Sequence, residues 1–308
     1  MSKKIIYFKG VLANVDSSIL KLILDHGFSI EAVSDKRGIN LISVLENTSF
    51  SEAGKKLFME YPCLNDSERK LYFINNSFES SITEMDGWTF SGVAQFDNKL
   101  IHGYLNPTIR LLRLFKEGDV RMPLKFYYTI DNNKTKRLMS FTLGRYVSRV
   151  LYLLESSEVK DLQKFIKETE LPFGESFLQL AFDNFELSYE THNINLSFLT
   201  LMVSLETLLN PGKQELRYRI SRNTAVLLGR DKAYSKKIFR EIKDLYDKRS
   251  KIVHAGRSDV IKKEDLLKLR HYVRESIKKI YKIGMDKNSV IDLLNCCGFG
   301  EIEPTSAG

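Results

Sequence analysis

The stretch Tyr246-Asp-Lys-Arg-Ser-Lys-Ile-Val-His-Ala-Gly256 lies late in the 308-residue chain and ends a run with helical periodicity. Four apolar residues and one arginine recur at steps of four, three, four and three, on one helix face: Ile238, Ile242, Leu245, Arg249 and Ile252. Arg249 therefore lies in the stripe that a folded protein buries. A guanidinium keeps its charge, and burying it alone is costly, so Arg249 requires a carboxylate or a phosphate.

His254 follows Arg249 by five residues, and Ala255-Gly256 predicts the end of the helix. Residues five apart on an ideal helix point about 140° apart. The two side chains can therefore meet at one phosphate only if the helix loosens at His254, or if a second copy of the chain completes the site. The sequence is compatible with both arrangements.

This stretch resembles the HEPN superfamily of helical ribonucleases, whose signature is an arginine, four to six further residues and a histidine. It is more narrowly similar to the ApeA-like HEPN group, in which a tyrosine-containing helix ends in an Arg-Ser-Lys-aliphatic-Val-His-Gly type of sequence. The upstream runs Ser197–Leu209 and Leu216–Leu228 resemble that group too, so the similarity covers roughly residues 173–283. After the arginine this chain has Ser250, where many active members have Asn, Asp or His.

The resemblance implies an RNA endonuclease that needs no metal or other cofactor. Arg249 would hold phosphate oxygens with its planar fork, and His254 would assist attack by the RNA 2′-hydroxyl or protonate the leaving oxygen. We expect Glu206, on the most apolar helix, to pair with Arg249. The other supporting candidates are Arg222, Ser250 and Tyr246. The candidate contacts to the RNA backbone are Arg217, Arg219, Lys248, Lys251 and Arg257.

The same resemblance implies a homodimer through the helical domain and a role as a toxin or abortive-infection effector in antiviral defence. RNA is the expected substrate, with tRNA as one candidate, and a phage-derived trigger or a neutralising partner is expected to control the effector. The alternative is a non-catalytic HEPN bundle for dimerisation or RNA binding. Ser250 favours this module, and the intact Arg249 and His254 favour the nuclease.

Charge is unevenly distributed along the chain. Residues 211–290 hold 23 Lys and Arg against 10 Asp and Glu, a net charge of +13, whereas the remaining residues hold 24 against 29, a net charge of −5. This asymmetry favours an anionic partner for the C-terminal block, although solvated helix faces would give the same counts.

The cysteines and the N-terminus predict a cytoplasmic protein without a membrane segment. Cys63, Cys296 and Cys297 form no disulfide framework, which is typical of a reducing compartment. The apolar run after Met1 is too short for a signal peptide. The chain also lacks the usual motifs of ATPases, zinc proteases and serine hydrolases.

The predicted fold class is α+β, with a mixed domain over residues 1–140 and an all-α bundle over 173–285. A helical connector over 141–172 joins them, and residues 286–308 form a C-terminal helix and tail.

Strands are predicted at 1–11, 70–74, 88–96 and 123–130, and short helices at 16–24, 51–61 and 106–115, with a turn at Asp97-Asn98. Bundle helices are predicted at 175–190, 195–209, 213–228, 232–253 and 262–283, and Gly284 predicts the end of the last one. The helix at 195–209 is apolar almost all round, so we expect it at the centre of the bundle. Residues 1–140 carry no chemical motif, and we expect them to restrain or direct the nuclease.

Overall fold

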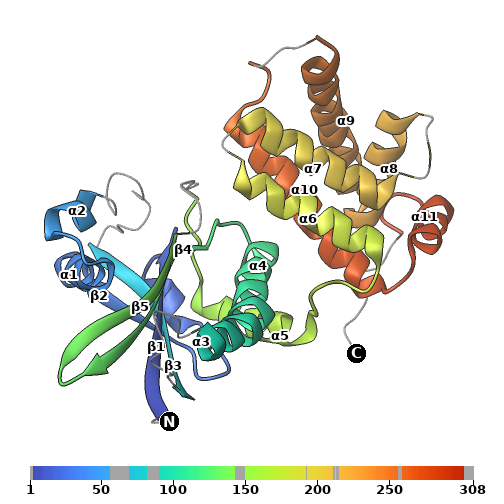
Figure 1. Cartoon of the computed structure of the whole chain (residues 1–308). Coiled ribbons are helices and arrows are strands. Elements are labelled where there is room, and N and C mark those ends of the chain that lie inside the picture. Colours follow the sequence, from blue (N-terminus) through green and yellow to red (C-terminus); the bar gives the residue numbers. More distant parts are fainter. Residues whose placement is uncertain are drawn as a thin grey trace. The chain divides into compact units, whose positions relative to one another are not determined.

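The computed structural model describes residues 3–55, 69–81, 90–142, 150–191, 193–210, 212, 215–255 and 259–301. The chain divides into two compact units, Met1–Thr169 and Glu170–Gly308 (Figure 1). A sheet in the first unit and helices in the second confirm the predicted α+β class. Some predictions fall outside the described residues: those for Cys63, Gly256, Arg257, residues 56–61 of the second predicted helix, residues 88–89 of the third predicted strand and the tail at 302–308.

Unit 1 is built on a five-stranded antiparallel sheet with the order β2-β3-β1-β4-β5. Its strands are β1 (Lys3–Ala13), β2 (Ser29–Ser34), β3 (Lys70–Ser81), β4 (Arg121–Asp131) and β5 (Lys134–Thr142). The strands predicted at 1–11, 70–74 and 123–130 are therefore confirmed. The central strand β1 lies between β3 and β4, with Phe8 opposite Asn76 on one side and Tyr127 on the other.

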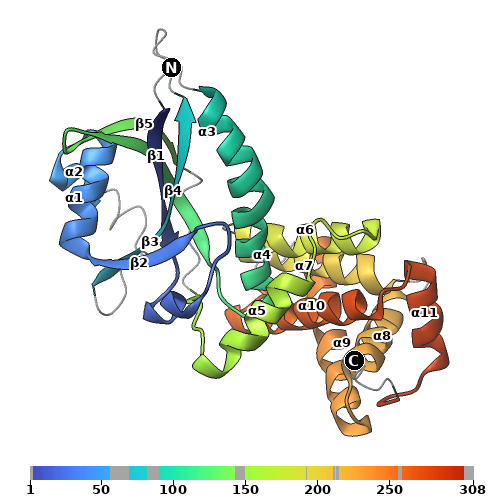
Figure 2. The same ribbon diagram turned by 90° about the horizontal axis from the view of Figure 1, so that it is seen from below.

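The two faces of this sheet carry separate cores because side chains alternate along each strand. Helices α1 (Asp35–Glu46) and α2 (Phe50–Lys55) cover one face, where Phe73 and Phe126 are buried. The helices α3 (Phe90–Phe96) and α4 (Asn106–Phe115), with the π-helix η4 (Asp97–Leu105) between them, cover the other face, where Phe8 and Tyr127 are buried. Figure 2 shows these two groups of helices on opposite sides of the strands. The remaining elements of this unit are η1 (Ser17–Lys21), η5 (Ser156–Glu158) and α5 (Val159–Glu168).

The strand predicted at 88–96 is wrong for its described part, which forms α3, and the turn predicted at Asp97-Asn98 is the start of η4. The buried positions explain the difference: Val93, Phe96, Ile101, Leu105, Ile109 and Leu112. They recur at three to five residues, which is a helical spacing, and the five-residue step from Phe96 to Ile101 fits the wider π turn. The strand prediction rested on a local β-favouring run, and the longer period overrides it.

Unit 2 is helical, and its elements confirm the predicted bundle helices within a few residues. They are α6 (Ser176–Glu190), α7 (Ile194–Leu209), α8 (Leu216–Leu228), α9 (Lys232–Ala255), α10 (Lys263–Ile283) and α11 (Lys287–Cys296). Helix α7 contacts α6, α8, α9 and α10, which confirms its predicted central place. The predicted stop of α10 is Gly284, whose φ of 67° is the left-handed conformation that glycine adopts readily. Within the described ranges, no helix is both long enough and apolar enough to cross a bilayer.

Candidate functional site

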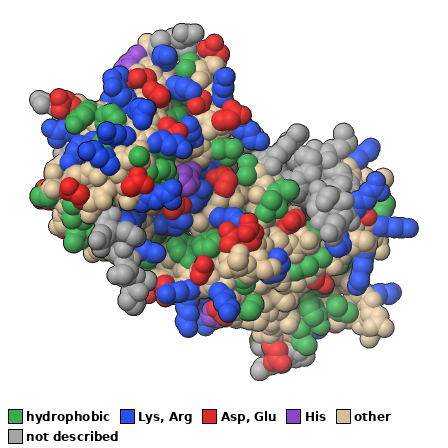
Figure 3. Space-filling model, turned by 180° about the vertical axis from the view of Figure 1, so that it is seen from behind, with side chains coloured by type: hydrophobic (Ala, Val, Ile, Leu, Met, Phe, Trp, Pro, Cys, Tyr) green, Lys and Arg blue, Asp and Glu red, His purple; other side chains and the backbone are tan. Residues whose placement is uncertain are grey.

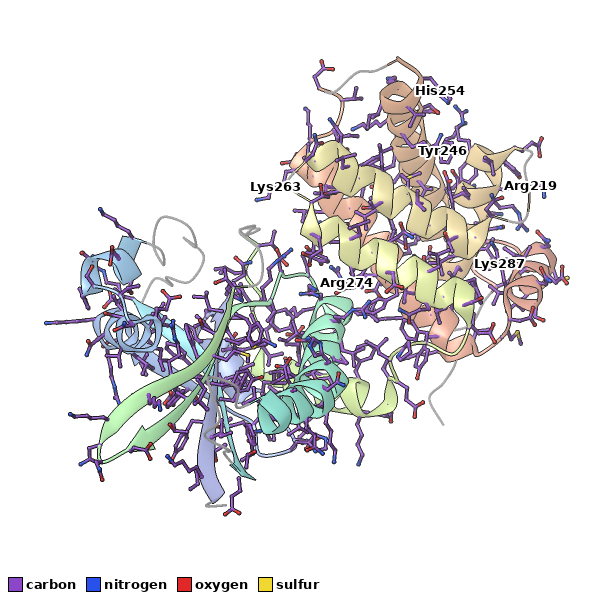
Figure 4. All side chains as sticks on the ribbon, in the orientation of Figure 1. Arg219, Tyr246, His254, Lys263, Arg274 and Lys287 are labelled. Atoms are coloured by element: carbon purple, nitrogen blue, oxygen red, sulfur yellow. The ribbon has the colours of Figure 1, made fainter. Side chains whose placement is uncertain are left out.

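Helix α9 carries both candidate catalytic residues and is continuous from Lys232 to Ala255. It begins after Asp231, whose side-chain Oδ1 accepts a hydrogen bond of 2.7 Å from the backbone N–H of Tyr234. His254 lies at the C-terminal end of α9, and Tyr246 lies further down the same helix (Figure 4). Because the helix stays regular through His254, it directs this side chain about 140° away from Arg249 and about 7.5 Å further along the axis. The loosening of the helix that could bring the two residues together is therefore absent from α9.

Arg249 lies on the buried face of α9 and pairs with Glu206 of α7, as expected from the sequence. Its Nε is 3.7 Å from Oε1 of Glu206, and the side chains are 25% and 19% exposed. The guanidinium makes no hydrogen bond to any described residue. Oε1 of Glu206 is buried and likewise receives no hydrogen bond from the described part of the chain. The pair is thus a loose electrostatic contact that leaves hydrogen-bonding capacity on both partners.

Tyr246 precedes Arg249 by one helical turn and forms a wall of the same site. Its ring centre is 5.7 Å from the guanidinium carbon of Arg249, and its side chain is buried. Burial and the negative charge of Glu206 raise the pKa of the Tyr246 phenol, and the charge of Arg249 offsets part of this rise. Tyr246 therefore remains protonated at neutral pH and keeps a hydroxyl that can donate a hydrogen bond.

His254 is exposed and forms no hydrogen bond or ion pair with the described residues. Ser250 precedes it by four residues on the same helix face and is half-buried. No hydrogen bond or ion pair of the described residues joins either side chain to the Arg249–Glu206 pair. The structure thus brings Arg249, Glu206 and Tyr246 together and places His254 and Ser250 on a different face of α9.

Arg222, expected from the sequence as a supporting residue of the Arg249 site, contacts the end of α11. Its guanidinium donates hydrogen bonds to the backbone carbonyls of Leu294 at 2.8 Å, Cys297 at 2.9 Å and Asn295 at 3.4 Å, at the end of α11. The last carbonyls of a helix lack partners within it, and a cation there is favoured by the helix dipole. Arg222 therefore anchors α11, and no described hydrogen bond or ion pair joins it to Glu206 or Arg249. Backbone acceptors carry no side-chain pattern, so no sequence signal indicated this role.

Three of the candidate RNA-binding cations lie beside a carboxylate, and Lys251 does not. Lys248 donates a hydrogen bond of 2.6 Å to Asp265 of α10. Burial would raise the pKa of Asp265, but this hydrogen bond and the Lys248 charge outweigh it and hold the pKa below its ordinary value. Arg217 lies 2.6 Å from Asp247 on an exposed surface, and Arg219 lies 4.0 Å from Glu215. Lys251 is exposed, and Arg257 lies outside the described residues.

Three further cations lie on the helix face of His254. They were not among the candidates predicted from the sequence. Lys236, Arg240 and Lys243 precede His254 by eighteen, fourteen and eleven residues, close to whole numbers of helical turns. The period of 3.6 residues, measured back from His254, is the signal that could have found them. The described residues contain no group of three or more His, Cys, Asp or Glu side chains suited to a metal ion.

Comparisons with models of known protein families, with curated proteins and with solved structures gave no match for this chain.

Proposed function

We propose that this chain is a metal-independent RNA endonuclease of the HEPN type, in which Arg249 and His254 act on the scissile phosphate. One observation carries the proposal. Arg249 is held in a half-buried setting by Glu206 at 3.7 Å, but its guanidinium has no hydrogen-bond partner among the described residues. A guanidinium in this state can take two phosphate oxygens in a bidentate contact. His254, exposed at the end of the same helix, is the second group that the reaction needs.

The proposed reaction is a phosphoryl transfer within the RNA backbone, from the 5′-oxygen to the 2′-oxygen. The 2′-oxygen attacks the adjacent phosphorus, the bond from phosphorus to the 5′-oxygen breaks, and the products carry a 2′,3′-cyclic phosphate and a 5′-hydroxyl. The 2′-hydroxyl loses a proton and the leaving 5′-oxygen gains one. His254 serves one of these two transfers, because an imidazole exchanges protons near neutral pH. Arg249 offsets the negative charge that develops on the phosphate oxygens.

A second copy of the chain completes the proposed site. In one copy the regular helix α9 directs Arg249 and His254 to different sides, so both cannot reach one phosphate. A homodimer through the helical unit would place Arg249 of one copy beside the partner subunit's His254. This arrangement also accounts for the open hydrogen-bonding capacity around Arg249.

Mixing two inactive variants of the full chain tests the shared site. We expect Arg249→Ala and His254→Ala each to abolish cleavage of an RNA oligonucleotide in EDTA. The mixed dimer of the two retains one site with both residues intact, so mixing should restore up to about a quarter of the wild-type activity if subunits exchange at random. A site made within one copy would give no recovery. Full activity of His254→Ala alone, or strict dependence on added magnesium, would contradict the nuclease itself.

We further propose that the enzyme acts in the cytoplasm as a toxin or abortive-infection effector, with residues 1–140 directing or restraining it. A phage-derived trigger or a neutralising partner would then set its activity, and RNA such as tRNA would be its target. Growth arrest on expression, rescued by His254→Ala at equal protein level, tests this role. Arrest that persists with His254→Ala would remove RNA cleavage as its cause.

The alternative is a non-catalytic module for RNA binding or dimerisation, and Ser250 after the arginine is the observation that favours it. Purified protein that binds RNA but leaves it intact, as a dimer and at every concentration tested, would establish this reading in place of the nuclease.

A further inference from the structure

The outer face of α9 carries a line of cations that ends at His254. The residues on this face are spaced four, three, eight and three apart: Lys236, Arg240, Lys243, Lys251 and His254. Lys243 is half-buried and the others are exposed. From Lys236 to His254 the line spans about 27 Å at ~1.5 Å per residue. It is a continuous surface on one helix, opposite the face that Arg249 presents to α7.

The positive charge on this face is not balanced locally. Lys236, Lys243 and Lys251 form no ion pair with the described residues. Asp247 interrupts the line, but Arg217 of α8 pairs with it at 2.6 Å, and Asp244 lies exposed at the edge. In the view from behind, Lys and Arg side chains lie on unit 2 among Asp, Glu and hydrophobic side chains (Figure 3).

On the side of α9 that faces α10, the charged side chains are paired. There Lys248 is held by Asp265 at 2.6 Å, and Glu241 of α9 takes a hydrogen bond of 3.1 Å from Lys268 of α10. Each of these lysines is committed to a carboxylate between the two helices. The cations of the outer face have no such carboxylate partner among the described residues, so they are available to an anionic ligand from solution.

An exposed aromatic side chain flanks the line. Tyr218 of α8 is 55% exposed, and its ring packs edge-on against Phe239 of α9 with 5.8 Å between the ring centres. Phe239 in turn contacts the ring of Phe299 at 6.1 Å. Tyr218 therefore offers a supported ring face beside Arg217 and the cations. Basic side chains that follow a backbone, with an aromatic ring on which a base can stack, are typical of single-strand binding.

We propose that the outer face of α9 is the path of a single-stranded RNA. Phosphates would lie on Lys236, Arg240, Lys243 and Lys251, an unpaired base would stack on Tyr218, and the strand would reach His254 at the end of the helix. This inference rests on the proposed function, since it takes His254 as the site to which the strand is delivered.

The test compares two triple charge reversals in the full chain. The path variant is Lys236→Glu with Arg240→Glu and Lys243→Glu. The control variant is Lys160→Glu with Lys164→Glu and Lys167→Glu on α5, three exposed lysines with the same spacing and the same change in net charge. The probe is a twelve-nucleotide 2′-O-methyl RNA, which lacks the free 2′-hydroxyl and so binds without being cleaved by the wild-type protein.

Affinity is measured by fluorescence anisotropy at several KCl concentrations. Three lost phosphate contacts should reduce the slope of log K against log salt by about 2, since each contact with a single strand contributes ~0.7. We expect at least a tenfold loss of affinity at low salt for the path variant and less than a twofold change for the control variant. Circular dichroism confirms that both variants keep their helices.

Tyr218→Ala sharpens the test because it removes stacking without changing charge. We expect roughly a tenfold loss of affinity for the single strand with an unchanged salt slope, and no loss for a duplex of equal length. A path variant that binds like the wild type, equal losses in both triple variants, or tighter binding to the duplex would overturn the path while leaving the cleavage assay unaffected. A wild-type protein that neither binds nor cleaves RNA would overturn the path and the proposed function together.

Discussion

Each unit of this protein buries a cation against a carboxylate, and the two pairs are built differently. In unit 1, Lys125 is 4% exposed and donates a hydrogen bond of 2.6 Å to Oδ1 of Asp97. The hydroxyl of Tyr127 also donates to Oδ1, and Nε2 of His102 lies 3.1 Å from Oδ2. In unit 2, Arg249 and Glu206 are 3.7 Å apart, and Oε1 of Glu206 has no hydrogen bond within the described residues.

The protonation behaviour of the unit 1 pair follows from these contacts. Burial alone would raise the pKa of Asp97, but hydrogen bonds from Lys125 and Tyr127 outweigh it and lower the pKa. Burial and the Asp97 carboxylate raise the pKa of Tyr127. Both carboxylate oxygens of Asp97 thus have partners, and we interpret this saturated unit 1 pair as structural. The unit 2 pair leaves donors and an acceptor open, which is the condition in which a further anion can bind.

Asp97→Ala should have the largest effect on stability because it leaves the Lys125 ammonium buried without its partner. We expect the free energy of unfolding to fall by about 3–5 kcal/mol. Urea denaturation of the full chain, followed by circular dichroism, measures it. The matched control is Asp131→Ala, which removes the exposed pair with Lys4 at 3.2 Å and should cost about 1 kcal/mol or less. Equal losses in the two variants would show that the unit 1 pair is not the saturated one.

Arg249→Ala should have a smaller effect on stability and a complete effect on cleavage. It leaves the half-buried Glu206 without its cation, which costs about 1–3 kcal/mol. Arg249→Lys should keep most of the stability but not the cleavage, because an ammonium cannot form the two-pronged phosphate contact. Measuring kcat and the unfolding midpoint of both variants separates the contribution of Arg249 to cleavage from its contribution to stability. Substantial cleavage by Arg249→Lys would argue against bidentate phosphate binding.

Lys248→Met should cost about 1 kcal/mol at neutral pH, since its pair with Asp265 is only partly exposed. The folded-state pKa of Asp265 lies below its ordinary value of 3.8. The pair therefore stabilises the fold fully above about pH 4, and this contribution is lost as the pH falls through the lowered pKa. The difference between variant and wild type should shrink in thermal denaturation as the pH falls below about 4. A difference that persists there would mean that Lys248 acts through packing of its aliphatic chain.

His254→Ala should have the smallest effect on stability, within about 0.5 kcal/mol, because an exposed helix-end side chain packs against little. Its effect on cleavage should nonetheless be complete. Thermal denaturation and the EDTA cleavage assay on the same preparation measure both. Ser250→Ala is the matched control on the same helix face, and we expect it to retain cleavage. A large loss of stability in His254→Ala would indicate a structural role and weaken the comparison with Arg249.

Periodicity in the sequence determined most of the helical unit. The apolar spacing from Ile238 to Ile252 predicted α9, the nearly uniform apolarity of residues 195–209 predicted the central α7, and Gly284 predicted the end of α10. The burial of Arg249 also predicted that it needs a carboxylate or a phosphate, and Glu206, the carboxylate expected from the sequence, lies beside it. These features depend on residues close together in sequence or on the single requirement that a buried charge be paired, so a pattern can carry them.

Only the tertiary structure decided the partners that depend on the backbone and on packing between distant elements. Arg222 binds carbonyls of α11, which no side-chain pattern marks, and Lys248 turns to Asp265 because α10 lies on that side of α9. The segment Phe90–Leu105 is helical because its apolar residues must meet one face of the sheet, and that need overrides its local β preference. Whether α9 loosened at His254 was likewise open in the sequence. It depends on the hydrogen bonds of the last helical turn, and these keep His254 and Arg249 on different faces of one regular helix.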